Sequence, residues 1–241
     1  MTDNTGPGPT VTGWAPPPLP GRLSLTGDYA ALTPLDAGRD ASDLFAAYDG
    51  HPALWDFLSI GPFSAQSAFH RWMRAAVEAE DRVYFAVRDR TNGRALGLCA
   101  LMRIKPEMGT IEIGTIVFSP ALQKSRVATE AIHLLMDWAV SAGYRRVEWK
   151  CDSRNLASRR AAQRLGFSYE GVFRQHMVVK GRNRDTAWFA ITDGDWPALR
   201  EAFRVWLAPA NFDASGRQKE RLSDLTRLVR VADDPMLKRR E

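Results

Sequence analysis

The chain has 241 residues, 45% of them hydrophobic, and a formal net charge of +5. This size and apolar content suit one compact α/β or α+β domain with short tails and exclude a need for disulfide or metal staples. The cysteines lie in apolar runs outside any CxxC pair, no stretch approaches the roughly 18 apolar residues of a membrane span, and the first residues carry no signal-peptide pattern. We therefore expect a soluble, cytoplasmic protein with reduced thiols and no membrane partner.

The first half of the chain predicts a lead-in, three helices and an antiparallel meander. Residues 1–21 are rich in Pro and Gly and should be disordered. Apolar spacing then predicts a strand at 29–34 and helices at 36–48, at 51–58 and after Ser64, whose side chain is placed to cap its helix. Beyond this point the period becomes that of strands, and turn residues at 91–93 and 106–109 separate three of them: 83–87, 96–101 and 111–118.

The second half predicts a crossover and a hairpin. A helix at 126–142, ended by Gly143, joins the strand 111–118 to a strand at 146–151, and this order implies a parallel pair. The remaining elements are a helix at 155–165, hairpin strands at 167–179 and 186–192, and a last helix that Asp193 can cap. The pattern divides the chain into a body at 22–207 and a C-terminal arm at 208–241, with a short helix near 223–231.

The most informative segment runs from Ser119 to Ala131, where a buried strand enters a short basic loop that opens a long helix. The first N–H groups of a helix lack partners within the helix, and its dipole is positive there, so this junction suits an anion such as a pyrophosphate. Ser125 and Ala128 are small enough for close approach, and Arg126 offers a charge-assisted contact. By itself, the same pattern also fits an ordinary strand–loop–helix turn.

The residues of this loop resemble a known signature. Gln123 to Ala131, Q-x-x-R-x-A-T-E-A, is similar to the acetyl-CoA signature Q/R-x-x-G-x-G/A of the GNAT superfamily, and Asn155 to Phe167 is similar to its N-x-x-S/A…L-G-F block. The resemblance covers about 22–207 and is nearest to the ribosomal-protein alanine acetyltransferase-like (RimJ/RimL-type) branch. It implies an α+β (α/β) GNAT fold: a mixed, mostly antiparallel twisted sheet split between two parallel strands, with helices on both faces. Arg126 departs from the signature, because it replaces the first glycine.

The resemblance implies an N-acyltransferase that moves an acetyl group from acetyl-CoA to a primary amine, on a small molecule or a protein N-terminus. Loop amides would hold the pyrophosphate, the edge of one strand would pair with the pantetheine arm where a bulge splays it from its parallel neighbour, and the Asn155 helix would hold the thiol and nucleotide ends. The implied cofactor-binding residues are Ile116, Val117, Phe118, Gln123, Lys124, Ser125, Arg126, Val127, Ala128, Thr129, Asn155, Ser158 and Arg159.

An amine must lose a proton before it attacks a thioester. Glu112 is the candidate base, because apolar neighbours on a central strand would favour proton uptake by its carboxylate, and relatives commonly have a glutamate at this position. The competing interpretation is a solvent-facing or salt-bridged structural glutamate. The tyrosine that many relatives use as general acid corresponds to Ala162, so the remaining candidates for the acid are Ser158, Tyr169 and His176.

Aromatic residues of the early helices would line the mouth of the acceptor site, where relatives vary: Trp55, Phe57, Phe63 and Trp72. The histidines show no metal-ligand spacing, so we expect no metal. The C-terminal arm could pack on its own domain or on a second copy, which leaves a monomer and a homodimer both open.

Two other functions are compatible with the same pattern. Some GNAT-like proteins take an aminoacyl group from aminoacyl-tRNA, and the clustered arginines of this chain could face RNA, although a solvated surface explains the charge equally well. The other alternative is a non-catalytic regulatory module that binds CoA.

Overall fold

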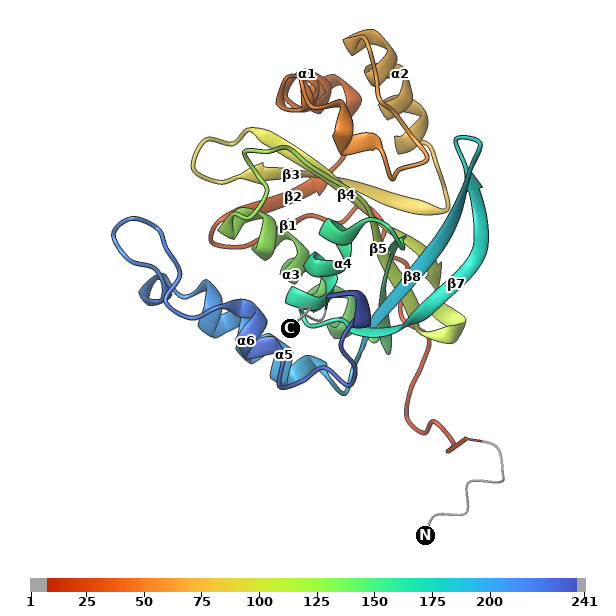
Figure 1. The fold of residues 1–241 in the computed structure, drawn as a ribbon, viewed down its shortest axis with the longest axis vertical. Helices are drawn as coiled ribbons and strands as arrows, with labels where there is room; N and C mark the ends of the chain where they lie inside the picture. Colours follow the sequence, from red (N-terminus) through yellow and green to blue (C-terminus); the bar gives the residue numbers. More distant parts are fainter. Residues whose placement is uncertain (1–7, 238–241) are drawn as a thin grey trace.

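Eight strands pair into one mixed sheet in the computed structural model, which describes residues 8–237 (Figure 1). The order across the sheet is β1-β2-β3-β4-β5-β6-β8-β7. The strands span Leu25–Thr26 (β1), Ala30–Pro34 (β2), Arg82–Asp89 (β3), Ala95–Lys105 (β4), Thr110–Phe118 (β5), Arg146–Asp152 (β6), Ser168–Val179 (β7) and Arg182–Thr192 (β8). Every neighbouring pair is antiparallel except β5 and β6, which are parallel because a helix crosses between them. This topology confirms the predicted fold class.

Helices cover both faces of the sheet, with α1 and α2 on one face and α3, α4 and α5 on the other (Figure 1). Alternate residues of β3 and β4 therefore enter different layers: Phe85 and Cys99 pack in the α3 layer, whereas Ala86 and Leu98 pack in the α1 layer. The helices span Ala37–Tyr48 (α1), Gln66–Val77 (α2), Arg126–Ser141 (α3), Leu156–Arg164 (α4), Trp196–Leu207 (α5) and Leu222–Thr226 (α6), with 3-10 turns at Pro52–Trp55 (η1), Pro106–Met108 (η2), Pro209–Asn211 (η3) and Pro235–Leu237 (η4).

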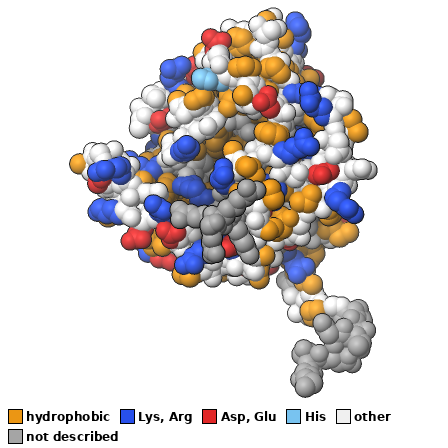
Figure 2. All heavy atoms as spheres, in the orientation of Figure 1, with side chains coloured by type: hydrophobic (Ala, Val, Ile, Leu, Met, Phe, Trp, Pro, Cys, Tyr) orange, Lys and Arg blue, Asp and Glu red, His pale blue; other side chains and the backbone are white. Residues whose placement is uncertain are grey.

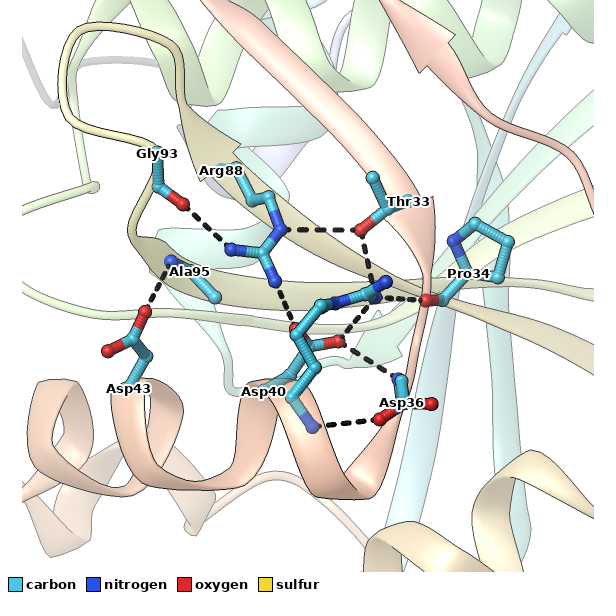
Figure 3. A network of polar contacts seen from close by, with 9 residues as sticks. Thr33, Pro34, Asp36, Asp40, Asp43, Arg88, Gly93 and Ala95 are labelled. Carbon is cyan, nitrogen blue, oxygen red and sulfur yellow. Dashed lines mark hydrogen bonds and ion pairs between the residues drawn. The ribbon is translucent and has the colours of Figure 1, made fainter.

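A buried carboxylate fixes α1 to the strands beneath it (Figure 3). Asp40 is fully buried and forms ion pairs with Arg39 and with Arg88 of β3. It also accepts a hydrogen bond from the backbone N–H of Asp36, whose own side chain caps the helix by accepting from the N–H of Arg39. The ion pairs with Arg39 and Arg88 offset the cost of burying the Asp40 charge, and they fix the position of α1 on the sheet.

The strand β2 is tied to α3 by Glu130, which lies in the same helical segment as the loop signature. Its carboxylate is 4% exposed and accepts hydrogen bonds from three successive backbone N–H groups, those of Asp28 (2.9 Å), Tyr29 (2.6 Å) and Ala30 (2.6 Å). A Cβ on Gly27 would lie 2.4 Å from the Glu130 carboxyl carbon, so only glycine fits at that turn. The glutamate of the A-T-E-A run is therefore a structural residue.

We expect Glu130→Gln to lower the free energy of unfolding by about 1–3 kcal/mol. The new NH₂ group is a donor, and it would face backbone N–H groups that need an acceptor. Urea unfolding of the purified chain measures the change. Glu107→Gln on the exposed η2 turn is the matched control and should change the free energy by less than about 0.5 kcal/mol. Equal effects of the two substitutions would contradict a structural role for Glu130.

Several local expectations differ from the structure. Helix α2 begins after Ala65, with no side-chain cap, so the prediction that Ser64 caps it is wrong. The expected second helix is a single 3-10 turn, and α6 is shorter than the predicted helix. Within the predicted lead-in, the Trp14 indole donates to the Gly143 carbonyl at 2.9 Å, so this segment packs against the turn after α3. Residues 1–7 of the lead-in lie outside the described part.

The two cysteines are free and buried in the α3 layer. Burial raises the pKa of the Cys151 thiol to about 11, and it raises that of Cys99 as well. Both thiols are therefore protonated at neutral pH and take no part in the chemistry described below.

Candidate active site

The parallel strands β5 and β6 separate in the middle of the sheet. They pair only where Thr110, Ile111 and Glu112 face Arg146, Val147 and Glu148. Beyond Glu112, β5 keeps its register with β4 as far as Phe118, but no described residue of β6 is registered beside it. One edge of β5 is thereby free to pair with an extended ligand.

Two β-bulges accompany this separation. The register of β5 against β4 gains one residue between Gly114 and Val117, and the bulged residue, Thr115, has a φ of 45°. A second bulge on β4 holds Arg103 at a φ of 47° and turns its side chain toward Glu112. Both residues are in the left-handed region, which is unfavourable for a β-branched or long side chain. The strain bends the strands where the sheet opens.

The loop before α3 presents backbone N–H groups. Lys124, with a φ of 59°, turns the chain, and Ser125 caps the helix by accepting from the Ala128 N–H at 3.0 Å. The N–H of Thr129 reaches the Ser125 carbonyl. Within residues 8–237, no acceptor meets the N–H groups of Lys124, Arg126 or Val127. Three donors without an acceptor among the described residues, at the positive end of a 16-residue helix, could hold an anion.

The Arg126 side chain does not enter this anion site. Its guanidinium lies over the rings of Tyr29 (4.7 Å) and Phe212 (4.3 Å), between the start of the sheet and the C-terminal arm. The expected contact of this guanidinium with the phosphates is therefore replaced by a structural one, and the arginine leaves the N–H groups uncovered. Gln123 is likewise occupied, because its amide donates to the Phe118 carbonyl at 2.9 Å.

The expected strand edge and α4 contacts are partly occupied as well. The Val117 carbonyl accepts from the Tyr48 hydroxyl at 2.9 Å, whereas no polar side chain among the described residues contacts the backbone of Ile116. Asn155 caps α4 by accepting from the Ser158 N–H at 3.0 Å, and the Ser158 hydroxyl accepts from the Trp149 indole at 3.0 Å. The amide NH₂ of Asn155 has no partner within residues 8–237.

Arg159 is not available to a ligand. Its guanidinium is 2% exposed and pairs with both oxygens of the fully buried Asp234, at 2.6 Å each. It also donates to the Ser153 carbonyl at 2.7 Å. The hydrogen bonds with Asp234 raise the pKa of Arg159. The residue fastens the C-terminal arm to α4, which contradicts its expected contact with the nucleotide end of a cofactor.

The Glu112 carboxylate lies at the point where β5 and β6 separate. It is 4% exposed, and its Oε2 atom lies 2.8 Å from Arg103 Nε and 2.9 Å from Lys150 Nζ. Neither contact has the angle of a hydrogen bond, so Oε2 has no hydrogen-bond partner in the described part of the chain. Lys150 also approaches Glu148 at 3.1 Å and the ring of Trp188 at 3.9 Å. The carboxylate is thus buried and held by two cations.

His176 lies on the β7 bulge near this cluster, with its Nδ1 atom 2.9 Å from the Thr186 hydroxyl. Partial burial and the positive charges of Arg103 and its neighbours lower the pKa of His176. The imidazole is therefore mainly neutral at neutral pH, which makes it a poor proton donor. The bulge forms an open hollow of about 580 Å³ lined by Phe173, Arg174 and Gln175.

Known proteins share this fold. A family profile described as the acetyltransferase (GNAT) domain matches residues 31–168, which is over half of the chain. The chain belongs to the GNAT acetyltransferase family. A GCN5-related N-acetyltransferase from Brucella melitensis is 44% identical, with a TM-score of 0.87 over 90% of this chain and 100% of that chain. The uncharacterized N-acetyltransferase p20 of Bacillus licheniformis is 25% identical over 62% of this chain and 86% of its own length.

A Salmonella typhimurium acetyl transferase that modifies the N-terminal serine of ribosomal protein L7/L12 has the same fold, with 18% identity and a TM-score of 0.61 over 70% of this chain and 99% of that chain. At this identity the likeness concerns the fold alone. The comparisons therefore identify an N-acetyltransferase of the GNAT family, but they do not assign it to the RimJ/RimL-type branch.

The aromatic residues expected at the acceptor mouth of this GNAT enzyme belong mostly to the hydrophobic core between the sheet and the helices α1 and α2. Trp55 is 4% exposed and meets the ring of Phe63 edge-on, and Phe63 packs in turn on Trp72. Phe57 alone of the four is exposed. The Lys180 ammonium at the β7–β8 tip donates to the Trp55 carbonyl at 2.9 Å, so η1 and the hairpin meet beside β5.

Sequence reasoning missed two residues that contact Glu112 in this GNAT enzyme, Arg103 and Lys150. The signal for Lys150 was available, because it lies on β6 two residues from Glu148, on the same side of the strand, and Glu148 faces Glu112 in register. Arg103 could not be found in this way, since its bulge changes the side to which the side chain points. No group of three acidic, histidine or cysteine residues within 8–237 could hold a metal ion, and no helix there has the length and apolarity to cross a bilayer.

Proposed function

We propose that this GNAT enzyme transfers the acetyl group of acetyl-CoA to a primary amine, on a small molecule or a protein N-terminus. The observation that carries the proposal is the set of three unpartnered N–H groups at the start of α3, beside the free edge of β5. GNAT acetyltransferases use acetyl-CoA as their co-substrate. When bound, this group supplies an activated thioester carbonyl for attack by the amine.

The residues of the opening fit such a ligand. The N–H groups of Lys124, Arg126 and Val127 would bind the diphosphate, because backbone donors at a helix N-terminus match its charge. The backbone of Ile116 at the free edge of β5 would pair with the amides of the pantetheine arm, as an added strand would. The unpartnered amide of Asn155 points to a further contact on the opposite side of the opening.

Glu112 is the proposed base. Its burial keeps bulk water from solvating the carboxylate, and Arg103 and Lys150 hold the group in place at the separation of the strands. An acceptor ammonium that enters beside the β7 hollow would give its proton to Glu112, directly or through one water molecule. The ion pairs also support the competing structural interpretation, and comparing Glu112→Gln with Glu148→Gln separates the two.

The general acid has weaker support. His176 is mainly neutral, and the Ser158 hydroxyl already accepts from Trp149. A coenzyme A thiolate is a stable leaving group near neutral pH, so the reaction does not depend on a strong acid. The free thiols of the chain support a reducing compartment, and we propose that the enzyme acts in the cytoplasm.

The test compares two substitutions at one position. Arg126→Ala removes the side chain that stacks on Tyr29 and Phe212 but keeps the N–H group, whereas Arg126→Pro removes both. Proline is tolerated at the first position of a helix, and Ser125 before it is already extended. Loss of a hydrogen bond to a charged group costs about 1.5–3 kcal/mol, so Arg126→Pro should bind acetyl-CoA roughly 10- to 100-fold more weakly than Arg126→Ala.

Isothermal titration calorimetry measures the two dissociation constants, and mass spectrometry of a panel of amines and N-terminal peptides detects the added acetyl group. Equal affinity of the two variants for acetyl-CoA would mean that the N–H group of residue 126 does not bind the diphosphate. Absence of acetyl-CoA binding by the unmodified chain would overturn the proposed function itself.

A further inference from the structure

A second hollow, of about 230 Å³, lies between α4 and the C-terminal arm, residues 208–237. Three arginines dominate its lining, which consists of Arg160, Gln163, Arg164, Ser223, Arg230 and Leu237. We call this hollow the arginine pocket. Figure 2 shows several Lys and Arg side chains on the face of the molecule that carries α3 and α4.

The positive charge of the arginine pocket is not balanced by the described residues. No carboxylate within residues 8–237 lies in ion-pair distance of Arg160 or Arg164, although these like charges are four residues apart on one face of α4 and repel each other. Arg230 pairs with Asp233 at 2.8 Å and is 4% exposed. Three guanidinium groups therefore share one carboxylate, and the pocket has an excess of about two positive charges.

Arg164 connects the pocket to the anion site at α3. Its Nη1 atom donates to the Thr129 hydroxyl at 3.2 Å, and Thr129 lies in the first turn of α3, next to the unpartnered N–H groups. The guanidinium also lies over the Trp206 ring at 4.9 Å. Burial lowers the pKa of Arg164, which reflects the cost of holding this cation without an anion. A ligand anion would remove that cost.

We infer that the arginine pocket binds the phosphate monoester on the ribose of CoA, and this inference rests on the proposed function. A diphosphate at the N–H groups of α3 would place the ribose end of the same molecule within reach of α4. A phosphate monoester carries between one and two negative charges near neutral pH and accepts paired hydrogen bonds from guanidinium groups. Free inorganic phosphate has the same chemistry and is the alternative source of the anion.

The C-terminal arm supplies part of this pocket. Arg230 and Ser223 lie outside residues 31–168, the stretch that the family profile matches. Arg230 is held in place by the Gln163 carbonyl, to which it donates at 3.1 Å, and the Arg159–Asp234 pair fastens the segment that follows it. In this chain, the family domain would provide the diphosphate contacts and the arm would provide selectivity for the ribose phosphate.

The experiment compares CoA with 3′-dephospho-CoA, which differ only in this phosphate, by calorimetry on the full chain. We expect CoA to bind at least about tenfold more tightly, since the phosphate accepts charge-assisted hydrogen bonds. Arg160 is exposed, so its replacement should not disturb folding. Arg160→Gln should lower the affinity for CoA and leave the affinity for 3′-dephospho-CoA unchanged. Arg230→Gln should do the same, whereas Arg204→Gln on α5 removes an equal charge away from the pocket and should preserve the preference.

Each result supports or overturns the inference. If both ligands bind the unmodified chain with equal affinity, the arginine pocket does not bind the ribose phosphate, while the proposed function stands. The same conclusion follows if Arg160→Gln and Arg230→Gln both retain the preference. Inorganic phosphate should compete more strongly with CoA than with 3′-dephospho-CoA, because it can occupy the arginine pocket as well as the N–H groups of α3. Equal competition with both nucleotides would count against the pocket. If neither nucleotide binds, the proposed function fails and the inference fails with it.

Discussion

Replacing Glu112 by glutamine is expected to lower kcat/KM for acetyl transfer by about 10²- to 10⁴-fold, the range for loss of a general base. Glutamine keeps the shape of the side chain but cannot take a proton from the amine. Affinity for acetyl-CoA should stay near that of the unmodified chain, because the N–H groups of α3 are untouched. Steady-state rates with an amine acceptor measure the effect, and calorimetry measures the affinity for acetyl-CoA.

Glu148→Gln is the matched control for this substitution. Glu148 faces Glu112 in register and also contacts Lys150, at 3.1 Å, so its replacement removes one carboxylate from the same ammonium. A base at Glu112 predicts a large loss of rate for Glu112→Gln and a small one for Glu148→Gln. Equal losses would instead mean that Glu112 only compensates the charges of Lys150 and Arg103, which would end its assignment as base.

Asp234→Asn is expected to lower the free energy of unfolding by about 3–5 kcal/mol. The substitution leaves the Arg159 guanidinium, 2% exposed, facing a neutral amide in the interior. Urea unfolding measures the free energy, and hydrogen exchange of residues 222–237 shows whether the arm separates from α4 before the sheet unfolds. The arginine pocket would lose Arg230 together with the arm, so the preference for CoA over 3′-dephospho-CoA should also fall.

The double variant Arg159→Met, Asp234→Leu separates the loss of the pair from the presence of an unpaired charge. Replacing both members of a buried ion pair by apolar residues is often neutral, so it should recover most of the stability lost in Asp234→Asn. Arg204→Gln, which breaks an exposed pair with Glu201, should change the free energy by less than about 1 kcal/mol. A small effect of Asp234→Asn would show that apolar contacts, and not this pair, hold the arm.

The sequence predicts the sheet and the free N–H groups at the start of α3 because both depend on local signals. The change from helical to strand period defines the meander, and the single crossover helix after Phe118 requires the parallel pair. The N–H groups at Arg126 and Val127 follow from the same junction, since the first donors of any helix lack partners within the helix. These features need no knowledge of distant contacts.

The errors involve residues whose partners are distant in the sequence. The local sequence around Arg126 and Arg159 predicted contacts with a ligand. Their partners, Phe212 and Asp234, lie instead in the C-terminal arm, and no local sequence pattern indicates these contacts. The aromatic residues Trp55 and Trp72 show the same limit. An aromatic side chain on a short helix can line a mouth or fill a core, and only the packing of α1 and α2 decides between them.

The position of Arg126 between Tyr29 and Phe212 has a consequence for how the protein is made. The two rings that cover this guanidinium come from opposite ends of the chain, so the start of α3 cannot reach its final packing until residue 212 has left the ribosome. The body can collapse earlier, during synthesis, with this surface still exposed. Completion of the ligand-binding end is therefore a late event in the folding of the nascent polypeptide.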